Sequence, residues 1–286
     1  MNRPSRVETQ SHRLNAMTIT FDAHRFKTAA QHYVQGRLDY PPELIERVVS
    51  LTGLGGHHRV LDLGCGPGFL AAGFAPYVSE VVGMDPEPAM LEQAANYAAA
   101  RGARVKLIQG SSYDLGDHLG RFQLVTIGRA FHWMDRSATL DALARAIAVD
   151  GVVALFGDAH LELSENDWKR SFRSILEPFA EKDPAHGARH GNPAWITHEA
   201  VLLGSVFCRL QRISVVRRLK TPIERLLDRA LSMSSTSPER LGADRDRLLE
   251  SLRTVLAEKA VDGLVTEVVE SEALLAFREM PFAPIA

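Results

Sequence analysis

The stretch Val60-Leu61-Asp62-Leu63-Gly64-Cys65-Gly66-Pro67-Gly68 decides how this chain folds. A short apolar run that contains an acid is followed by glycines at every second position. Glycine adopts backbone conformations that are closed to residues with side chains, so such a turn brings bare backbone against a ligand. We expect a strand over 59–63, a glycine turn, and a helix from Phe69 whose N-terminal amides point at the same place.

A second acid follows at a distance that suits a nucleoside site. The apolar run Val81-Val82-Gly83-Met84 ends in Asp85, 23 residues after Asp62. An acid at the tip of the neighbouring strand is placed to accept hydrogen bonds from a ribose. The two segments together predict a nucleoside-binding crevice.

Two classes of nucleoside ligand compete for this crevice. A dinucleotide fingerprint reads G-x-G-x-x-G, and its third glycine lets the helix pack closely on the strand. Here the spacing is G-x-G-x-G, and Phe69 stands where that third glycine is needed. The preceding acid, Asp62, either accepts from a ligand ammonium group or orders the turn. This pattern resembles motif I of class I S-adenosylmethionine-dependent methyltransferases, and we favour S-adenosylmethionine over a dinucleotide. Cys65 is interpreted as a small residue that fits the turn rather than as a reactive thiol.

Length and composition favour a cytoplasmic enzyme with a small-molecule partner. The 286 residues carry 33 basic and 35 acidic side chains, which leaves no basic surface that predicts a nucleic-acid partner. Two cysteines suit a reducing compartment. No apolar stretch approaches the ~20 residues of a membrane span, and we expect a disordered segment at 1–20 rather than a secretory signal. No cluster with metal-ligand spacing is visible, and a monomer and a homodimer both stay open.

Strands and helices alternate regularly in the first half of the chain. The pattern predicts strands at 59–63, 80–84, 105–109, 122–128 and 152–156, with helices at 69–77, 88–100 and 137–149 between them. Such alternation is typical of an α/β fold with a parallel, doubly wound sheet. Strands at 209–219 and 265–277 complete a mostly parallel seven-stranded, Rossmann-like sheet with helices on both faces.

We divide the chain into five parts on this basis: a disordered N-terminus at 1–20, a helical cap at 21–56, a core at 57–160, an insertion at 161–205 and the rest of the core at 206–286. The insertion is rich in aromatic residues. It is either a lid that carries specificity, as loops at strand ends often do, or a packing subdomain without ligand contact.

The resemblance to class I methyltransferases extends past the glycine turn. It implies that Asp85 is the ribose-binding acid. Ser111 stands where the family's G-D-A-x-D-L pattern has the Asp that usually accepts from the adenine amino group. A serine hydroxyl also accepts; alternatively, Ser111 and Ser112 only form a turn while backbone amides meet the ring. The resemblance implies a cofactor-binding set of Tyr33, Arg37, Asp62, Gly64, Cys65, Gly66, Gly68, Asp85, Pro86, Met90, Ser111, Ser112, Tyr113, Arg129 and Ala130.

Two further segments are similar to one branch of that family. Gly128-Arg129-Ala130-Phe131-His132-Trp133-Met134-Asp135 resembles the A-x-H-W-x-D run of small-molecule methyltransferases related to the trans-aconitate enzymes. Upstream, Ala29 to Tyr33, Arg37 and Tyr40-Pro41-Pro42 resemble the branch's A-x-x-Y-x-x-x-R-x-x-Y-P entry, a segment that closes over cofactor and substrate. The resemblance implies methyl transfer to a small molecule, to oxygen first and to nitrogen or carbon next.

His132 is the predicted general base, since an imidazole titrates near neutrality and can take a proton from a hydroxyl. Alternatively His132 only packs under the cleft, because proximity alone can suffice for methyl transfer. Arg129 either holds an acidic group of the substrate or is a solvated arginine. The predicted substrate-contacting set is Tyr33, Arg129, His132, Trp133, Trp168 and Trp195. Two other hypotheses stay open: an S-adenosylmethionine-binding enzyme that catalyses cyclisation or rearrangement, and a binding protein on a decayed scaffold.

Overall fold

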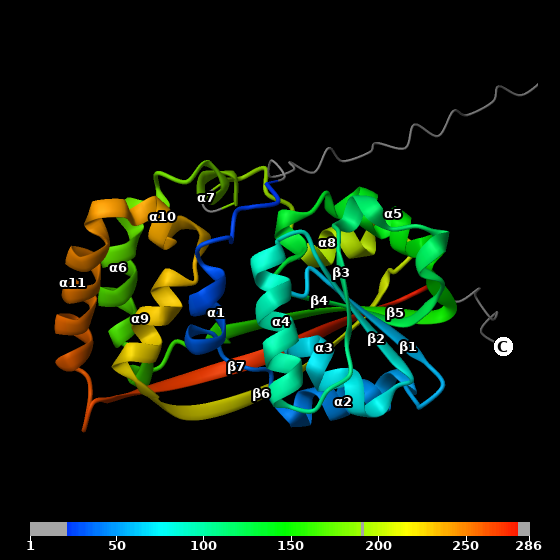
Figure 1. Cartoon of the computed structure of the whole chain (residues 1–286), viewed down its shortest axis with the longest axis horizontal. Helices are drawn as coiled ribbons and strands as arrows, with labels where there is room; N and C mark the ends of the chain where they lie inside the picture. Colours follow the sequence, from blue (N-terminus) through cyan, green and yellow to red (C-terminus); the bar gives the residue numbers. More distant parts are fainter. Residues whose placement is uncertain (1–21, 190–191, 280–286) are drawn as a thin grey trace, which may run out of the picture.

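A seven-stranded sheet with the order β3-β2-β1-β4-β5-β7-β6 forms the centre of the computed structural model, which describes residues 22–189 and 192–279 (Figure 1). The predicted disordered segment at 1–20 lies outside these residues. Strands β1 to β5 pair in parallel, and β7 is antiparallel to both β5 and β6. The predicted mostly parallel, Rossmann-like sheet is confirmed. The strands are β1 Arg59–Leu63, β2 Glu80–Asp85, β3 Lys106–Gln109, β4 Phe122–Gly128, β5 Ile147–His160, β6 Arg209–Pro222 and β7 Leu264–Phe277.

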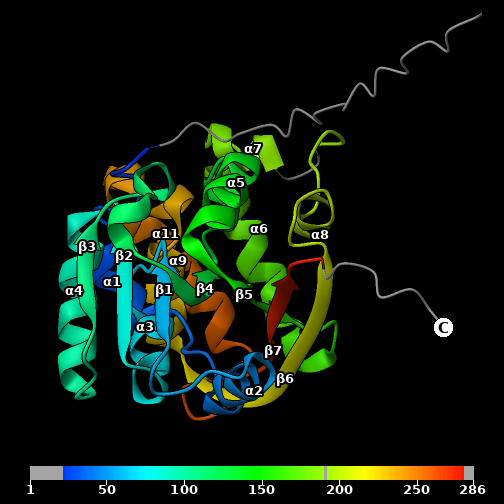
Figure 2. The same ribbon diagram turned by 90° about the vertical axis from the view of Figure 1, so that its right-hand side faces the viewer.

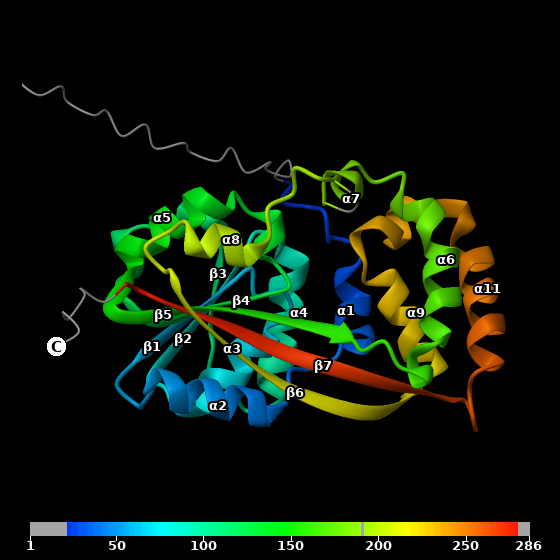
Figure 3. The same cartoon turned by 180° about the vertical axis from the view of Figure 1, so that it is seen from behind.

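Helices cover both faces of the sheet, as predicted (Figure 3). One face packs against α2 (Pro42–Thr52), α3 (Phe69–Phe74) and α4 (Pro88–Ala100), and the other against α5 (Arg136–Ala146) and α8 (His198–Leu203). The boundaries of α2 follow from its sequence, because a proline favours the first helical position and Gly53 ends the helix in the left-handed conformation. No helix within the described ranges combines the length and apolarity needed to cross a membrane.

Strand β5 is longer than its apolar pattern predicts. The helix expected at 137–149 ends at Ala146, and the strand expected at 152–156 runs from Ile147 to His160. Its last residues, Gly157-Asp158-Ala159-His160, carry no alternating apolar pattern. They are extended because β7 pairs with them as far as His160 opposite Val269. Long-range pairing decides this boundary, and local propensity does not.

The long strands β5, β6 and β7 extend beyond β1 to β4 and carry a separate helical lobe (Figure 1). Figure 2 shows β3 and β6 at the two opposite edges of the sheet. The helices α6, α9 and α11 share a core of their own, built mainly from leucines. The lobe comprises α1 Ala30–Gly36, α6 Trp168–Ala180, α7 Pro184–Arg189, α9 Ile223–Leu231, α10 Pro238–Leu241 and α11 Arg245–Ala257. Within the helical cap expected at 21–56, α1 and α2 are α-helices, and residues 23–29 form turns before α1.

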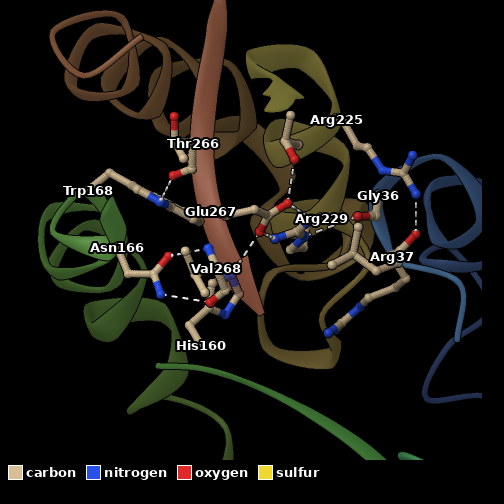
Figure 4. A network of polar contacts seen from close by, with 12 residues as sticks. Gly36, Arg37, His160, Asn166, Trp168, Arg225, Arg229, Thr266, Glu267 and Val268 are labelled. Carbon is tan, nitrogen blue, oxygen red and sulfur yellow. Dashed lines mark hydrogen bonds and ion pairs between the residues drawn. The ribbon is translucent and has the colours of Figure 1, made fainter. Parts of the chain in front are cut away.

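A buried ion pair joins this lobe to the sheet (Figure 4). The two terminal nitrogens of Arg229, on α9, donate to the Glu267 carboxylate on β7 at 2.7 and 3.1 Å. His160 at the end of β5 contacts the same carboxylate through Nε2 at 2.8 Å, and Thr221 on β6 also donates to it. Burial alone would raise the pKa of Glu267, but its partners, His160 and Arg229 foremost, hold it well below its usual range. Nε of Arg229 donates to the carbonyl of Gly36 at 3.1 Å, so the same residue also holds α1.

We expect Glu267→Gln to lower the free energy of unfolding by about 3–5 kcal/mol, because it leaves the Arg229 guanidinium as a buried charge without a counter-charge. Urea unfolding at neutral pH measures this difference. The matched control is Glu250→Gln on the exposed face of α11, which should change stability by less than about 0.5 kcal/mol. A Glu267→Gln variant as stable as the control would contradict this role.

Stability should also depend on pH through Glu267. Its pKa is lower in the folded than in the unfolded chain, so its contribution is present above the ordinary glutamate pKa of about 4.3 and is lost as pH falls toward the folded value. The urea midpoint of the wild-type protein should therefore drop more steeply on acidification below about pH 4.5 than that of Glu267→Gln. If the urea midpoints of the two proteins fell equally with pH, the partners of the Glu267 carboxylate would not stabilise its charged form.

Candidate active site

The glycine turn has the conformation that its spacing predicts. Gly64, Gly66 and Gly68 have φ angles of 67°, 52° and 80°, all in the left-handed region. A side chain on Gly64 would lie 2.8 Å from Cβ of Ala130, whereas one on Gly66 would have no neighbour closer than Sδ of Met90 at 4.0 Å. Gly66 and Met90 both line a cavity beside the turn, which we call the first cavity. Bare backbone therefore faces this cavity, as a close-fitting ligand requires.

Asp62 lies beneath the turn and is almost fully buried. It accepts hydrogen bonds from the backbone N–H of Ala71 at 2.9 Å and from Oγ1 of Thr126 at 3.0 Å. Burial raises its pKa to about 7. These contacts tie β1 to α3 and β4, which supports the interpretation that Asp62 orders the turn. A contact with a ligand ammonium group stays a prediction.

Asp85 ends β2 and lines the first cavity. It accepts from the backbone N–H of Gly66 at 2.8 Å and from that of Glu87 at 3.0 Å. Burial raises its pKa to about 6. A carboxylate has about four lone-pair positions, so both backbone bonds leave capacity for hydroxyl donors from a ligand.

The first cavity gathers most of the predicted cofactor-binding set. Its lining includes Tyr33, Gly64, Gly66, Asp85, Pro86, Met90, Ser111, Ser112, Arg129 and Ala130. Other predicted members lie elsewhere: Asp62 and Cys65 are buried, Gly68 precedes α3, Tyr113 is exposed and Arg37 lines a second cavity. Burial raises the pKa of the Cys65 thiol, in keeping with a small structural residue. The hydroxyl of Ser111 accepts from the N–H of Tyr113 at 3.2 Å, which supports the turn interpretation of this serine.

Sequence patterns missed several residues of the first cavity. Arg25 and Phe26 reach it from the turns before α1, and Glu87 reaches it from the start of α4. Phe26 packs edge-on against Trp133, with ring centroids 5.6 Å apart. No motif marks Arg25 and Phe26, and only the packing of the N-terminal segment brings them to the cavity. The signal for Glu87 was local: its side chain accepts from the N–H of Ala89 and caps α4.

Arg129 is held rigidly at the end of β4. Its φ of 55° is unusual for a residue with a side chain. The guanidinium forms an ion pair with Asp158, donates to the carbonyl of Leu38 at 2.9 Å and lies 4.5 Å from the ring centroid of Tyr40. Arg129 is thus a buried, ion-paired arginine and not a solvated one. Strained backbone of this kind is common at functional sites, where the surrounding structure enforces it.

A second cavity of about 900 Å³ lies next to the first. Residues of β5, α6 and α9 line it, and Phe26, Tyr33, Arg129 and Trp133 line both cavities. Most of the predicted substrate-contacting set lies here, namely Tyr33, Arg129, His132, Trp133 and Trp168.

Trp195 packs instead against Arg136, whose guanidinium lies 4.0 Å from the centroid of the Trp195 ring. His132 occupies a 3₁₀ turn, Phe131–Trp133, directly after β4, and its ring lies 4.5 Å from that of Trp133. Across residues 22–189 and 192–279, no three or more His, Cys, Asp or Glu side chains form a group that could hold a metal ion.

Comparison with known proteins agrees with this geometry. Residues 60–151 match the family model described as a methyltransferase domain. An uncharacterized methyltransferase of Mycobacterium tuberculosis, Rv3342, is 28% identical over 234 residues, which cover 81% of this chain and 85% of that protein. The uncharacterized methyltransferase YcgJ of Bacillus subtilis is 35% identical over 96 residues, which cover 33% of this chain and 38% of that protein.

Solved structures share the fold. The crystal structure of YcgJ superposes with a TM-score of 0.50 at 21% identity, over 84% of this chain and 99% of that chain. The S-adenosylmethionine-dependent methyltransferase of Thiobacillus denitrificans, solved in complex with S-adenosylhomocysteine, gives a TM-score of 0.52 at 16% identity, over 92% of this chain and 100% of that chain. From these matches, residues 60–151 form a methyltransferase domain, and the chain shares its fold with S-adenosylmethionine-dependent methyltransferases.

Proposed function

We propose that this enzyme transfers the methyl group of S-adenosylmethionine from the first cavity to a small molecule held in the second. The observation that carries the proposal is the contiguity of the two cavities, which share Phe26, Tyr33, Arg129 and Trp133. The donor supplies an electrophilic methyl group on a sulfonium. Transfer is an in-line displacement, so the accepting atom has to lie at the boundary between the cavities. A volume of about 900 Å³ for the second cavity suits a small-molecule acceptor.

The residues of the first cavity fit a nucleoside. The unsubstituted backbone at Gly66 permits close approach of a ligand, and Asp85 presents a carboxylate at the end of the neighbouring strand. We infer that Asp85 accepts from the ribose hydroxyls, while Met90 and Ser112 lie against the rest of the nucleoside. This arrangement places the ligand outside the carboxyl ends of β1 and β2, next to the point between β1 and β4 where the strand order reverses.

Oxygen is the accepting atom that we favour. His132 lines the second cavity, and its neighbour Trp133 lines both cavities, so the imidazole lies on the acceptor's side of the boundary. A hydroxyl acceptor loses a proton as the methyl group arrives, and His132 is the group that would take it. Nitrogen and carbon acceptors remain the next alternatives. Two free cysteines, Cys65 and Cys208, fit the reducing cytoplasm that we propose as the location.

Asp85→Asn should weaken S-adenosylhomocysteine binding about 10- to 100-fold, because hydrogen bonds to a charged group contribute about 1.5–3 kcal/mol. Isothermal titration calorimetry on the full-length protein measures the affinity. Asp117→Asn, a change in an exposed acid of the same type, should leave affinity within twofold of wild type. Unaltered affinity in Asp85→Asn would contradict this placement of the ribose.

The affinity should also fall in acid. Ribose hydroxyls donate to the ionised carboxylate, and the pKa of Asp85 in the free protein is about 6. Binding should therefore be constant above about pH 7 and weaken by up to tenfold per pH unit below about pH 6, as protons compete for the carboxylate. Titrations of Asp85→Asn over the same pH range should show a flatter profile. Equal slopes in the two proteins would assign the pH dependence to another group.

Methyl transfer itself is tested by incubating the protein with S-adenosylmethionine and panels of hydroxyl, amine and acidic acceptors, with mass spectrometry of both products. We expect S-adenosylhomocysteine and a methylated acceptor in equal amounts. Converted acceptor without S-adenosylhomocysteine would instead favour cyclisation or rearrangement.

With a hydroxyl acceptor, His132→Ala should lower kcat about 10²- to 10⁴-fold and leave S-adenosylhomocysteine affinity unchanged. His118→Ala, a change in an exposed histidine, is the control and should keep the wild-type kcat. A His132→Ala enzyme with full kcat would show that this histidine only packs.

A further inference from the structure

Basic side chains that line the second cavity differ in whether they have an ion-pair partner. The carboxylates of the cavity each contact a basic side chain: Asp158 contacts Arg129, Glu177 contacts His186, Asp183 contacts Arg25, and both Glu199 and Glu272 contact Arg212. Arg229 is matched by the buried Glu267. Within the described part of the chain, the cavity-lining cations Arg37, Lys169 and Arg173 have no carboxylate at ion-pair distance. This wall of the cavity therefore carries unmatched positive charge.

Arg37 lies at the most crowded part of that positive charge. Its Nε donates to Oγ of Ser232 at 2.8 Å, a neutral partner. Asp158 is the carboxylate whose charge acts on Arg37. Three arginines, Arg129, Arg37 and Arg229, act on Asp158 and together hold its pKa below its usual range against the effect of burial. Burial also lowers the pKa of Arg37. Because Arg229 is paired with Glu267 and Asp158 forms its ion pair with Arg129, Arg37 is left able to attract another anion.

Lys169 extends the positive wall onto α6. It is half-buried, and its pKa is lowered first by burial and then by the neighbouring charge of Arg173, one turn further along the helix. The charges of Glu162 and then of Asp158 act on the pKa of Lys169 in the opposite direction, and Asp158 also acts on Arg37. A partly desolvated ammonium beside a like charge gains more from an anionic ligand than an exposed lysine does.

Hydrogen bonds anchor the segments that carry Arg37 and Lys169 (Figure 4). Arg225 donates to the backbone carbonyl of Arg37 at 2.7 Å, and Figure 4 shows the Arg37 side chain running in the other direction. At the start of α6, Nε1 of Trp168 donates to the carbonyl of Thr266 at 3.1 Å, which anchors the residue before Lys169 to β7. Both cation-bearing segments are thus held by backbone contacts before any ligand arrives, which lowers the entropic cost of binding.

We propose that the methyl acceptor is an acidic small molecule whose oxyanion, a carboxylate or a phosphate, is bound by Arg37, Lys169 and Arg173. The inference rests on the proposed function, because it places the acceptor in the second cavity. The proposed anion site does not include Arg129, because the Arg129 guanidinium is already ion-paired with Asp158. These cations select the acceptor by its charge, while His132 and the shared residues at the cavity boundary face the reacting end.

The test measures binding of charged and neutral probes to the full-length protein saturated with S-adenosylhomocysteine. The probes are phenylacetate, its neutral isostere phenylacetamide, phenyl phosphate and inorganic phosphate, titrated by calorimetry at low ionic strength. We expect phenylacetate or phenyl phosphate to bind at least tenfold more tightly than phenylacetamide. The more tightly bound of the two acids identifies the oxyanion as a carboxylate or a phosphate.

Variants assign the binding to the named residues. Lys169→Met and Arg37→Gln should each remove most of the preference for the acid, and Lys169→Arg should restore it. Arg170→Met, an exposed neighbour on α6 outside the cavity lining, is the matched control and should keep the preference. S-adenosylhomocysteine affinity should be unchanged in Lys169→Met, which shows that the variant is folded.

Two failures are distinguishable. Equal binding of acid and amide, or an acid preference that survives both Lys169→Met and Arg37→Gln, would overturn the anion site while S-adenosylhomocysteine still bound. Loss of S-adenosylhomocysteine binding in the wild-type protein would instead overturn the proposed cofactor cavity.

Discussion

The buried pair between Arg229 and Glu267 is the interaction on which the rest of this structure depends. Taking both charges out of water is costly, and the pair is stable because the guanidinium meets the carboxylate with two hydrogen bonds while His160 and Thr221 satisfy the remaining oxygen lone pairs. The same arginine holds Gly36. One contact thereby fixes the helical lobe on the sheet and α1 on the lobe, and with them both walls of the second cavity.

Two acids on neighbouring strands have different tasks because of where each lies along its strand. Asp62 lies within β1, where its oxygens meet the start of α3 and Thr126, so it serves the protein itself. Asp85 is the last residue of β2 and lies at the edge where the strands end. Its carboxylate lines a cavity while still accepting from the backbone of the glycine turn. The motif's two acids thus separate into one that supports the turn and one that lines the first cavity.

Charge in the second cavity is divided in a similar way. Arg129 follows β4 with a positive φ angle, and its guanidinium already contacts Asp158, Leu38 and Tyr40. Arg37 and Lys169 come from segments far apart in sequence and are matched less well. An anionic acceptor would complete this electrostatic arrangement, whereas a neutral one would leave several like charges close together in a partly dry cavity.

The sequence by itself determined the parallel half of the sheet, the glycine turn and the acid at the end of β2, because each of these depends on residues close together in the chain. Glycine spacing sets backbone conformation locally, and an apolar run ending in an acid marks a strand end. Tertiary structure alone decided the length of β5, whose last residues are extended because β7 pairs with them. It also decided that Phe26 reaches the first cavity and that Arg37 and Lys169 both line the second. Pairing, packing and charge balance join residues over a hundred positions apart, and no local pattern records them.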